Sequence, residues 1–185
     1  GRGGGAGWRR VLSDMSTDEG PLGAAEGFLR LRGRVSYDGA AFSGWGLQPD
    51  RRTVQGDIEL ALANVLRAPR MHVQCAGRTD AGVHGLMQVV HFDTALRRPE
   101  SAWVRGTNTF LPPDIAVQWA QPVPREFHSR ASAIARRYTY LCLESPVRPS
   151  LEAGRVGWVF KPLQLDAMQD AAQHLLGEHD FSSFR

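Results

Sequence analysis

The residues best suited to chemistry form one short stretch, Gly77-Arg78-Thr79-Asp80-Ala81-Gly82-Val83-His84. Asp80 offers a carboxylate that can serve as a nucleophile or a base, Arg78 is a permanent cation two residues earlier, and His84 adds an imidazole four residues later. The two glycines of the stretch permit backbone angles and close approaches that other residues resist. The same pattern also fits a surface turn in which Asp80 only accepts hydrogen bonds from nearby amides. The residues alone leave both interpretations open.

Two strands are expected to hold this stretch, because residues 71–76 alternate in hydrophobicity before it and residues 87–92 are mostly apolar after it. Residues 28–37 alternate apolar and basic side chains, which predicts a strand with one basic face. After Thr53, apolar residues recur at helical spacing, which predicts a helix with Thr53 as its N-cap. A loop between strands can present Asp80 rigidly.

A second helix over residues 99–106 and a strand over residues 115–120 complete the series strand, helix, strand, strand, helix, strand. This order predicts an α+β fold in which a ferredoxin-like (split βαβ) unit has a mainly antiparallel sheet. Prolines flank the last strand, and the pattern then restarts. We therefore expect residues 28–124 to form an N-terminal α/β subdomain that carries the Asp80 stretch, and residues 125–185 to form the first half of a second, incomplete unit.

Within residues 125–185, the alternation over 136–143 predicts a strand with Arg136, Tyr138 and Tyr140 on one face. Apolar residues at helical spacing over 165–176 predict a helix, with Gly177 as its C-cap. The two cysteines, Cys75 and Cys142, lie in strand-like apolar patterns, and we interpret them as buried thiols without a disulfide or zinc site.

Composition indicates a globular chain, with 42% hydrophobic residues, 22% charged residues and a formal net charge of +3. Residues 1–27 are rich in glycine and weakly patterned, so we interpret them as a disordered leader. The chain begins with Gly1, which suggests a processed or excerpted piece. There is no apolar run of 18 residues, so we expect no membrane span and a cytoplasmic, reducing location.

Residues 77–84, followed by Gln88, His91 and Phe92, resemble the signature of the TruA family of tRNA pseudouridine synthases, whose active-site segment reads GRTDAGVH. The resemblance runs from about Leu31 to Arg185. The other matching segments occur in the family's order and at similar separations, and they are residues 37–48, Asn108, Leu111-Pro112, Phe127-His128-Ser129-Arg130, Arg137-Tyr138-Thr139-Tyr140 and residues 177–181. Within the first of these segments, Gly46 stands where the family usually has glutamine.

The resemblance implies a pseudouridine synthase fold, in which two ferredoxin-like units surround one cleft and the chain is typically a homodimer. It implies that uridine is isomerised to pseudouridine in the tRNA anticodon stem-loop, at about positions 38 to 40, with no metal or cofactor. Asp80 is then the catalytic carboxylate, either as nucleophile or as base. Tyr138 would stack on the target base, and Arg78 would fill the space left by the flipped nucleotide.

The family's second unit continues beyond the region matched here and carries a basic residue that pairs with the catalytic aspartate. We therefore expect a version truncated at its C-terminal end, whose own activity is open. His128, Arg130, Arg136 and Arg137 could contact RNA phosphates, although a solvated charged face fits them equally well.

Two other classes of function are alternatives to the isomerase. A non-catalytic RNA-binding module fits a ferredoxin-like sheet, and an inactive fragment of such an enzyme would behave similarly. An aspartate-dependent hydrolase would need a second carboxylate or a metal cluster, and the sequence offers neither at suitable spacing.

Overall fold

The computed structural model describes residues 28–184, so the leader expected over residues 1–27 lies outside the described part. The chain divides into two compact units, of which the first ends at Ile134 and the second begins at Ala135. Residues 125–134 thus belong with the first unit. Within residues 28–184, no helix combines the length and the apolar character needed to cross a bilayer.

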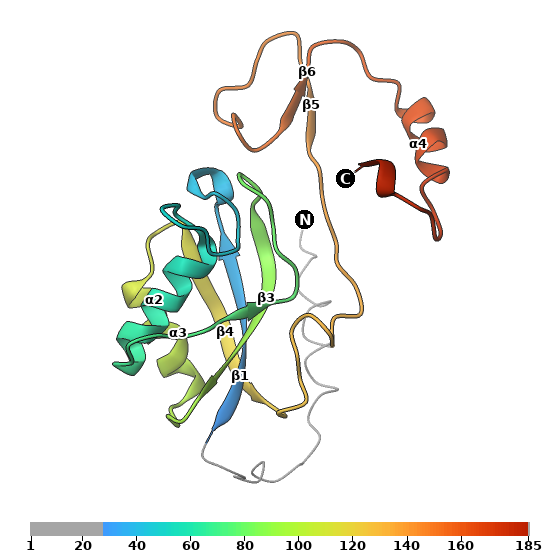
Figure 1. Ribbon diagram of the computed structural model, residues 1–185. Coiled ribbons are helices and arrows are strands. Elements are labelled where there is room, and N and C mark those ends of the chain that lie inside the picture. The colour runs from blue at the N-terminus through green and yellow to red at the C-terminus, as the bar shows by residue number, and fades with distance from the viewer. Residues whose placement is uncertain (1–27, 185) are drawn as a thin grey trace, which may run out of the picture. The chain divides into compact units, whose positions relative to one another are not determined.

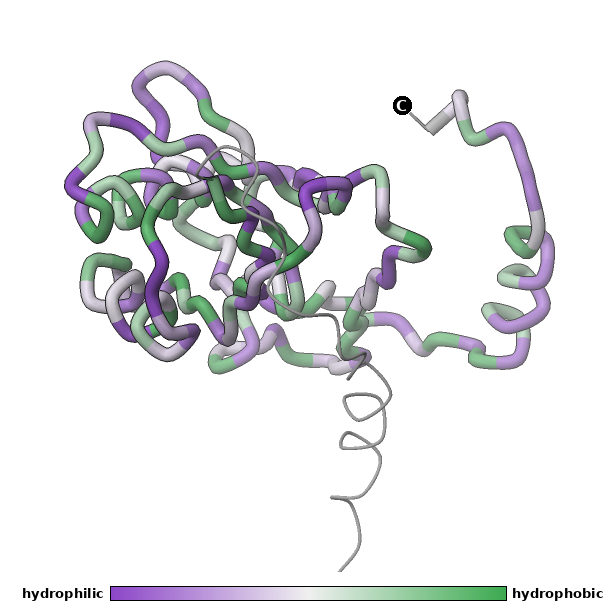
Figure 2. Tube along the Cα trace, turned by 90° about the horizontal axis from the view of Figure 1, so that it is seen from below, coloured by the Kyte–Doolittle hydropathy of each residue, from purple (hydrophilic) through white to green (hydrophobic). Residues whose placement is uncertain are grey.

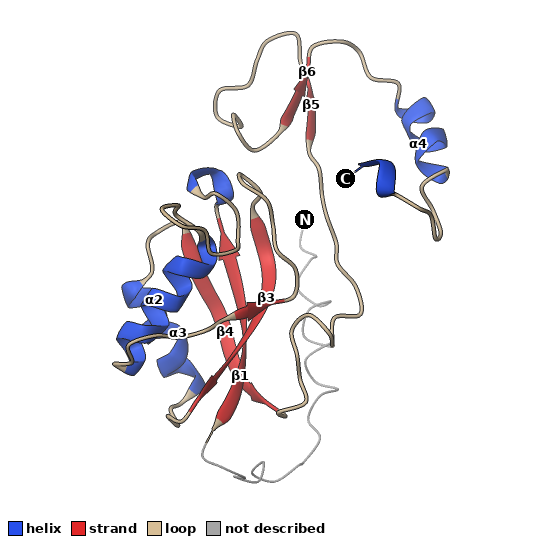
Figure 3. Cartoon of the chain, in the orientation of Figure 1, coloured by secondary structure: helices blue, strands red, loops and turns tan. Residues whose placement is uncertain are grey.

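The first unit is an antiparallel sheet with two helices against one of its faces (Figures 1 and 3). The strands lie in the order β2-β3-β1-β4, and every pairing is antiparallel. Its elements, in chain order, are β1 (Leu29–Tyr37), the 3-10 turn η1 (Gly39–Ala41), α2 (Val54–Leu66), β2 (Gln74–Cys75), β3 (Gly85–Thr94), α3 (Glu100–Phe110) and β4 (Ile115–Val123). The expected mixed α and β composition and the antiparallel sheet are confirmed.

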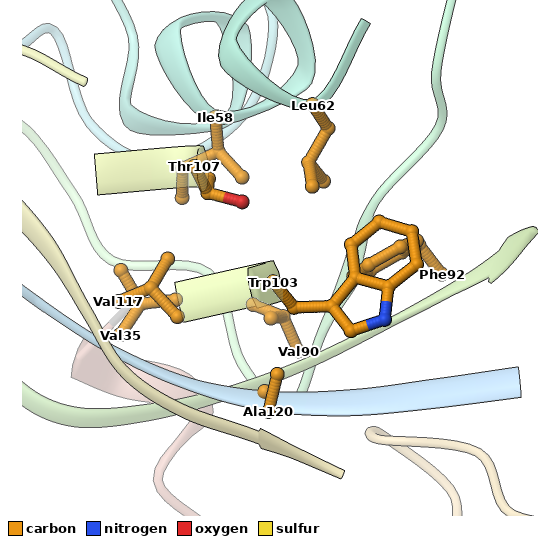
Figure 4. A pocket seen from close by; sticks show the side chains of 10 residues that line it. Val35, Ile58, Leu62, Val90, Phe92, Trp103, Thr107, Val117 and Ala120 are labelled. Atoms are coloured by element: carbon orange, nitrogen blue, oxygen red, sulfur yellow. The ribbon is translucent and has the colours of Figure 1, made fainter. Parts of the chain in front are cut away.

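The core lies between the sheet and the two helices. Along β1, Leu31 and Val35 are each 1% exposed, whereas the arginines that alternate with them point to the opposite face, as the sequence pattern predicted. On α2, Ile58 and Leu62 meet this face, and α3 adds Trp103 (Figure 4). Each of these large apolar side chains stabilises the fold by about 1.5 to 3 kcal/mol when it is fully buried.

Helix α2 begins where the sequence predicted, because the Thr53 hydroxyl accepts a hydrogen bond from the Gly56 N–H. The strand expected over residues 71–76 is shorter than predicted, since only Gln74–Cys75 pair with β3. At Val73 the backbone bonds to side chains of α2 instead of a strand. Cys75 is partly buried, but Cys142 is exposed, so its assignment as a buried thiol was wrong.

The second unit is small and open. A short β5 (Cys142–Glu144) pairs in parallel with β6 (Gly157–Val159), and α4 (Leu165–Gln173) and the 3-10 turn η2 (Ser182–Phe184) follow. Hydrophobic and hydrophilic residues alternate along α4 (Figure 2), yet no described residue of the unit is classed as buried. A hydrophobic core is therefore confined to the first unit within residues 28–184.

Two sequence predictions for the second unit were wrong. Residues 136–141 are not a strand, because β6 offers pairing partners only to Cys142–Glu144, so Arg136, Tyr138 and Tyr140 do not share a strand face. Helix α4 ends with His174 as its C-cap, and Gly177 adopts a positive φ of 94° in the turn beyond it.

Candidate active site

The Asp80 loop, defined here as residues 77–84, connects β2 to β3 and is bonded to its surroundings at several backbone positions. Just before the loop, the Ala76 N–H donates to Val89 O at 2.8 Å, and the side-chain amide of Gln88 donates to Gly77 O. In the middle, the Trp45 N–H donates to Thr79 O at 2.9 Å. These bonds fix the peptide units on the N-terminal side of Asp80.

Through Thr79 and His84, the loop is also bonded to the end of β1 and to the turn that follows it. The Tyr37 and Thr79 hydroxyls share a hydrogen bond of 2.8 Å. The Gly39 N–H donates to His84 Nδ1 at 3.1 Å, and an oxygen of the Asp38 carboxylate lies 3.0 Å from the same nitrogen. His84 thus helps to order the loop.

Glycines of the turn after β1 allow the two backbones to come this close. Gly44 has a positive φ of 95°, and a Cβ at this position would lie 2.9 Å from Thr79 O. At Gly39, a Cβ would overlap the carbonyl group of Val83. The Tyr37-Asp38-Gly39 segment is thus a docking surface for the Asp80 loop. Phe42 and Trp45, which close this turn, are 4% and 1% exposed and serve the core.

Asp80 itself is exposed, and no other residue in 28–184 gives its carboxylate a hydrogen bond or an ion pair. Arg78 is also exposed and does not form an ion pair with Asp80, so pairing with Asp80 does not explain its place in the loop. Its guanidinium lies beside Gly46, where a Cβ would be 3.4 Å from Arg78 Nε. The loop therefore presents a carboxylate and a cation to solvent on a rigid backbone, an arrangement suited to nucleophilic or general-base chemistry.

The sheet face opposite the helices carries the arginine row of β1. Arg30 forms an ion pair with Asp93 at 2.7 Å, which raises the pKa of Arg30 and lowers the pKa of Asp93. Burial lowers the pKa of Arg32, whose guanidinium stacks near the rings of Trp119 and Phe127 at 5.1 and 5.5 Å. In this part of the structure, the Nε atoms of Arg32 and Arg34 are buried without a hydrogen-bond partner.

The segment after β4 packs onto this arginine face. Arg30 donates to the carbonyl oxygens of Arg125 and Phe127, and the buried His91 accepts a hydrogen bond at Nδ1 from the Ser129 N–H at 3.1 Å. Burial, followed by the charge of Arg30, lowers the pKa of His91 to about 4, so the ring is neutral at physiological pH. The ring of His128 lies 4.8 Å from that of His91.

Four of the residues singled out from the sequence, Asp80, Arg78, His128 and Arg130, lie in the first unit. His128 Nδ1 accepts hydrogen bonds from the Arg130 and Ala131 N–H groups, so its local role is to shape its own turn. The remaining candidates lie in the second unit, all exposed, and they are Arg136, Arg137 and Tyr138. Their role beside Asp80 stays a prediction. Over residues 28–184, no three His, Cys, Asp or Glu side chains gather where they could hold a metal ion.

Sequence reasoning missed two side chains on α2, Gln55 and Glu59, that bond to Val73 and Leu47 in the segments next to the loop and its turn. Both are buried, at 6% and 8% exposure, between the apolar residues of the helix. The signal was available, because two polar residues four positions apart on an otherwise apolar helical stripe call for specific partners.

The first unit thus combines an antiparallel sheet covered by two helices, an exposed carboxylate on a loop held by that sheet, and a row of arginines on the other sheet face. Residues 34–130 match the family described as tRNA pseudouridine synthase. The chain belongs to this family.

Curated relatives extend the match. A tRNA pseudouridine synthase A of Polaromonas naphthalenivorans is 68% identical over 157 residues, which are 85% of this chain and 59% of the relative. The proteins of the same name in Paracidovorax citrulli and Delftia acidovorans are each 67% identical over 157 residues, covering 85% of this chain and 56% and 55% of the relatives. The chain thus spans somewhat more than half the length of these relatives.

Proposed function

We propose that the protein isomerises uridine to pseudouridine in tRNA, with Asp80 as the catalytic carboxylate. The observation that carries this proposal is the presentation of Asp80, which is exposed and unpaired within residues 28–184 on a loop whose backbone is bonded on both sides. Membership of the tRNA pseudouridine synthase family supports it. The substrate region is the anticodon stem-loop, at about positions 38 to 40, as the family resemblance implies.

The reaction breaks the N1–C1′ bond of the uridine, turns the uracil and joins C5 to C1′. The C5 proton leaves to solvent and N1 gains a proton, so atoms balance without a cofactor. The Asp80 carboxylate acts at the sugar or the base, either as a nucleophile that forms a covalent intermediate or as a base that removes a sugar proton. Because the loop backbone is fixed, little reorganisation is needed to bring the carboxylate to the reacting carbon.

The other assignments extend this proposal to the substrate. Arg78 occupies the space that the flipped nucleotide leaves, which agrees with its exposure and its lack of an ion pair to Asp80. Tyr138, which is 75% exposed, stacks on the target base. The phosphate contacts come from His128, Arg130, Arg136 and Arg137.

The proposed architecture is a pseudouridine synthase fold of two ferredoxin-like units. The sheet order β2-β3-β1-β4 supports the first unit, which corresponds to residues 28–124. In this proposal the first half of the second unit lies within residues 125–185, of which residues 125–134 pack with the first unit. The functional protein is a cytoplasmic homodimer with tRNA as its partner.

Tritium release from tRNA labelled at C5 of its uridines tests the function. The enzyme is a chimera in which the 157 matched residues of this chain are joined to the remainder of the Polaromonas naphthalenivorans relative. We expect release by the chimera and a loss of at least about 1,000-fold in Asp80→Asn, because the nucleophile or base is removed. Asp50→Asn is the control, since Asp50 is an exposed carboxylate with a positive φ of 55° that asparagine also adopts.

The outcomes separate the candidate functions. Equal release by Asp80→Asn and the parent chimera would refute the assignment of Asp80. If the chimera binds tRNA tightly but releases no tritium, the protein is better described as a non-catalytic RNA-binding module. The isolated 185-residue chain, assayed alongside, measures its own contribution.

A further inference from the structure

Two buried polar side chains on α2, Gln55 and Glu59, interrupt the helical face that packs on the sheet. They are only 6% and 8% exposed, and their neighbours on the same face, such as Ile58 and Leu62, are apolar. Burying an amide and a carboxyl group is unfavourable unless both are hydrogen-bonded. Their partners therefore identify what this part of the helix holds.

One set of partners lies in the chain that enters the Asp80 loop. Glu59 Oε1 accepts hydrogen bonds from the Val73 N–H at 2.9 Å and from Gln55 Nε2 at 2.8 Å. Gln55 Nε2 also lies 3.2 Å from Val73 O, to which it donates. The two side chains thus satisfy both backbone groups of Val73, as a neighbouring strand would. Val73 immediately precedes β2, and β2 leads into the loop.

The other set of partners lies in the turn that docks against the loop. The Leu47 N–H lies 3.4 Å from Gln55 Oε1, to which it donates, and the Gln55 N–H donates to Trp45 O at 3.0 Å. Trp45 in turn donates its N–H to Thr79 O, next to Asp80. Gln55 therefore connects the strand before the loop with the segment that bonds to the loop's centre.

We propose that Gln55 and Glu59 are positioning residues for Asp80. They hold the entry strand, residues 73–75, and the docking turn, residues 45–47, at a fixed spacing. This inference rests on the proposed function, because it takes Asp80 as the catalytic carboxylate. A buried, hydrogen-bonded network of this kind fixes one arrangement of the segments it joins, whereas apolar contacts permit small slips. A shift of about 1 Å at a reacting group can reduce a rate by about 100-fold.

Three variants of the chimera test the proposal. Glu59→Ala removes the acceptor for Val73, and we expect kcat to fall by about 10- to 100-fold while KM changes less than about threefold. Glu59→Gln retains an oxygen at the same place and should stay within about threefold of the parent. Leu62→Ala is the control for stability, since it weakens the core on the same helix and leaves both hydrogen bonds to Val73 in place, and its kcat should be unchanged below its melting transition.

A second measurement does not depend on activity. Cys75 lies two residues after Val73 and is partly buried, and burial raises the pKa of its thiol, whereas Cys142 is exposed. Alkylation by iodoacetamide, followed on the two cysteine-containing peptides, reports local opening of the entry strand. We expect Cys75 to react at least about tenfold faster in Glu59→Ala, relative to Cys142, and to be unaffected in Glu59→Gln and Leu62→Ala.

The proposal is overturned if Glu59→Ala leaves both kcat and Cys75 labelling unchanged, or if Leu62→Ala reproduces both effects at matched melting temperature. If the parent chimera releases no tritium, the proposed function fails, and Cys75 labelling still decides whether Glu59 holds the entry strand. The two failures are thus distinguishable.

Discussion

Substitution of Gly39 by alanine should separate the Asp80 loop from the turn that supports it. A Cβ at Gly39 would overlap Val83 O and lie 2.5 Å from the Val83 carbonyl carbon and 3.1 Å from that of Gly82. All of these atoms belong to the backbone, so no side-chain rotation relieves the overlap. The hydrogen bond from the Gly39 N–H to His84 would be strained as well.

The size of the effect follows from these distances. Ordinary contact between two carbons requires about 3.5 Å, so the two segments must move apart by about 1 Å. Inserting a methyl group into a packed contact typically costs about 1 to 3 kcal/mol of folding stability. Because Asp80 lies only three residues before Val83, the same movement should reduce kcat by about 100-fold.

Thermal unfolding of the chimera measures the predicted loss of folding stability, and tritium release by the same chimera measures the predicted reduction of kcat. Gly106→Ala on α3 is the matched control, since its Cβ would lie 3.6 Å from Val65, an ordinary contact. In a helix this change should raise stability by about 0.5 to 1 kcal/mol and leave the rate unchanged. If Gly39→Ala behaves like Gly106→Ala in both assays, the backbone docking of the loop is not what positions Asp80.

Two further perturbations test the packing of the first unit. The pKa of His91 is about 4 in the fold and about 6.5 in an unfolded chain, so only the unfolded state takes up this proton as the pH falls from 6.5 to 4. The free energy of unfolding should therefore decrease by about 2 to 3 kcal/mol as the pH falls through that window. In urea titrations at several pH values, this decrease should be absent in His91→Gln and present in His72→Gln. Arg52→Ala removes ion pairs to Asp57 and Asp114, and chemical denaturation should show that the free energy of unfolding falls by about 1 to 2 kcal/mol. The difference should shrink in 1 M salt, because salt screens exposed charges. A difference that does not depend on salt would contradict the electrostatic explanation.

The sequence predicted the first unit well because its elements carry strong local signals. The basic and apolar alternation of β1 and the Thr53 cap of α2 both correspond to features of the structure. The strand predicted over residues 71–76 is too long, because alternating hydrophobicity indicates which side chains are buried and does not indicate the hydrogen-bond partners of the backbone. At Val73 those bonds go to helix side chains, and no local pattern encodes that choice.

The second unit was predicted less well for a related reason. Residues 136–143 have the alternation of a strand, but strands need partners, and β6 pairs with only two of these residues, Cys142 and Leu143. Within the candidate site, the Asp80 loop was found from its residue types and its match to a known signature. The supporting pair Gln55 and Glu59 was missed, because buried polar residues reveal their function only when their partners are seen.

Among residues 28–184, the hydrogen bonds that hold the Asp80 loop join it to β1, to the turn after β1 and to β3, which belong to the first unit. Of the residues proposed to contact the substrate, Tyr138, Arg136 and Arg137 belong to the second unit, whereas Arg78, His128 and Arg130 belong to the first. The loop geometry is therefore encoded in the first unit, and the proposed substrate contacts come from both. A mutation that displaces the Asp80 loop and leaves the fold intact should act on kcat, whereas one at Tyr138 should act mainly on the binding of tRNA.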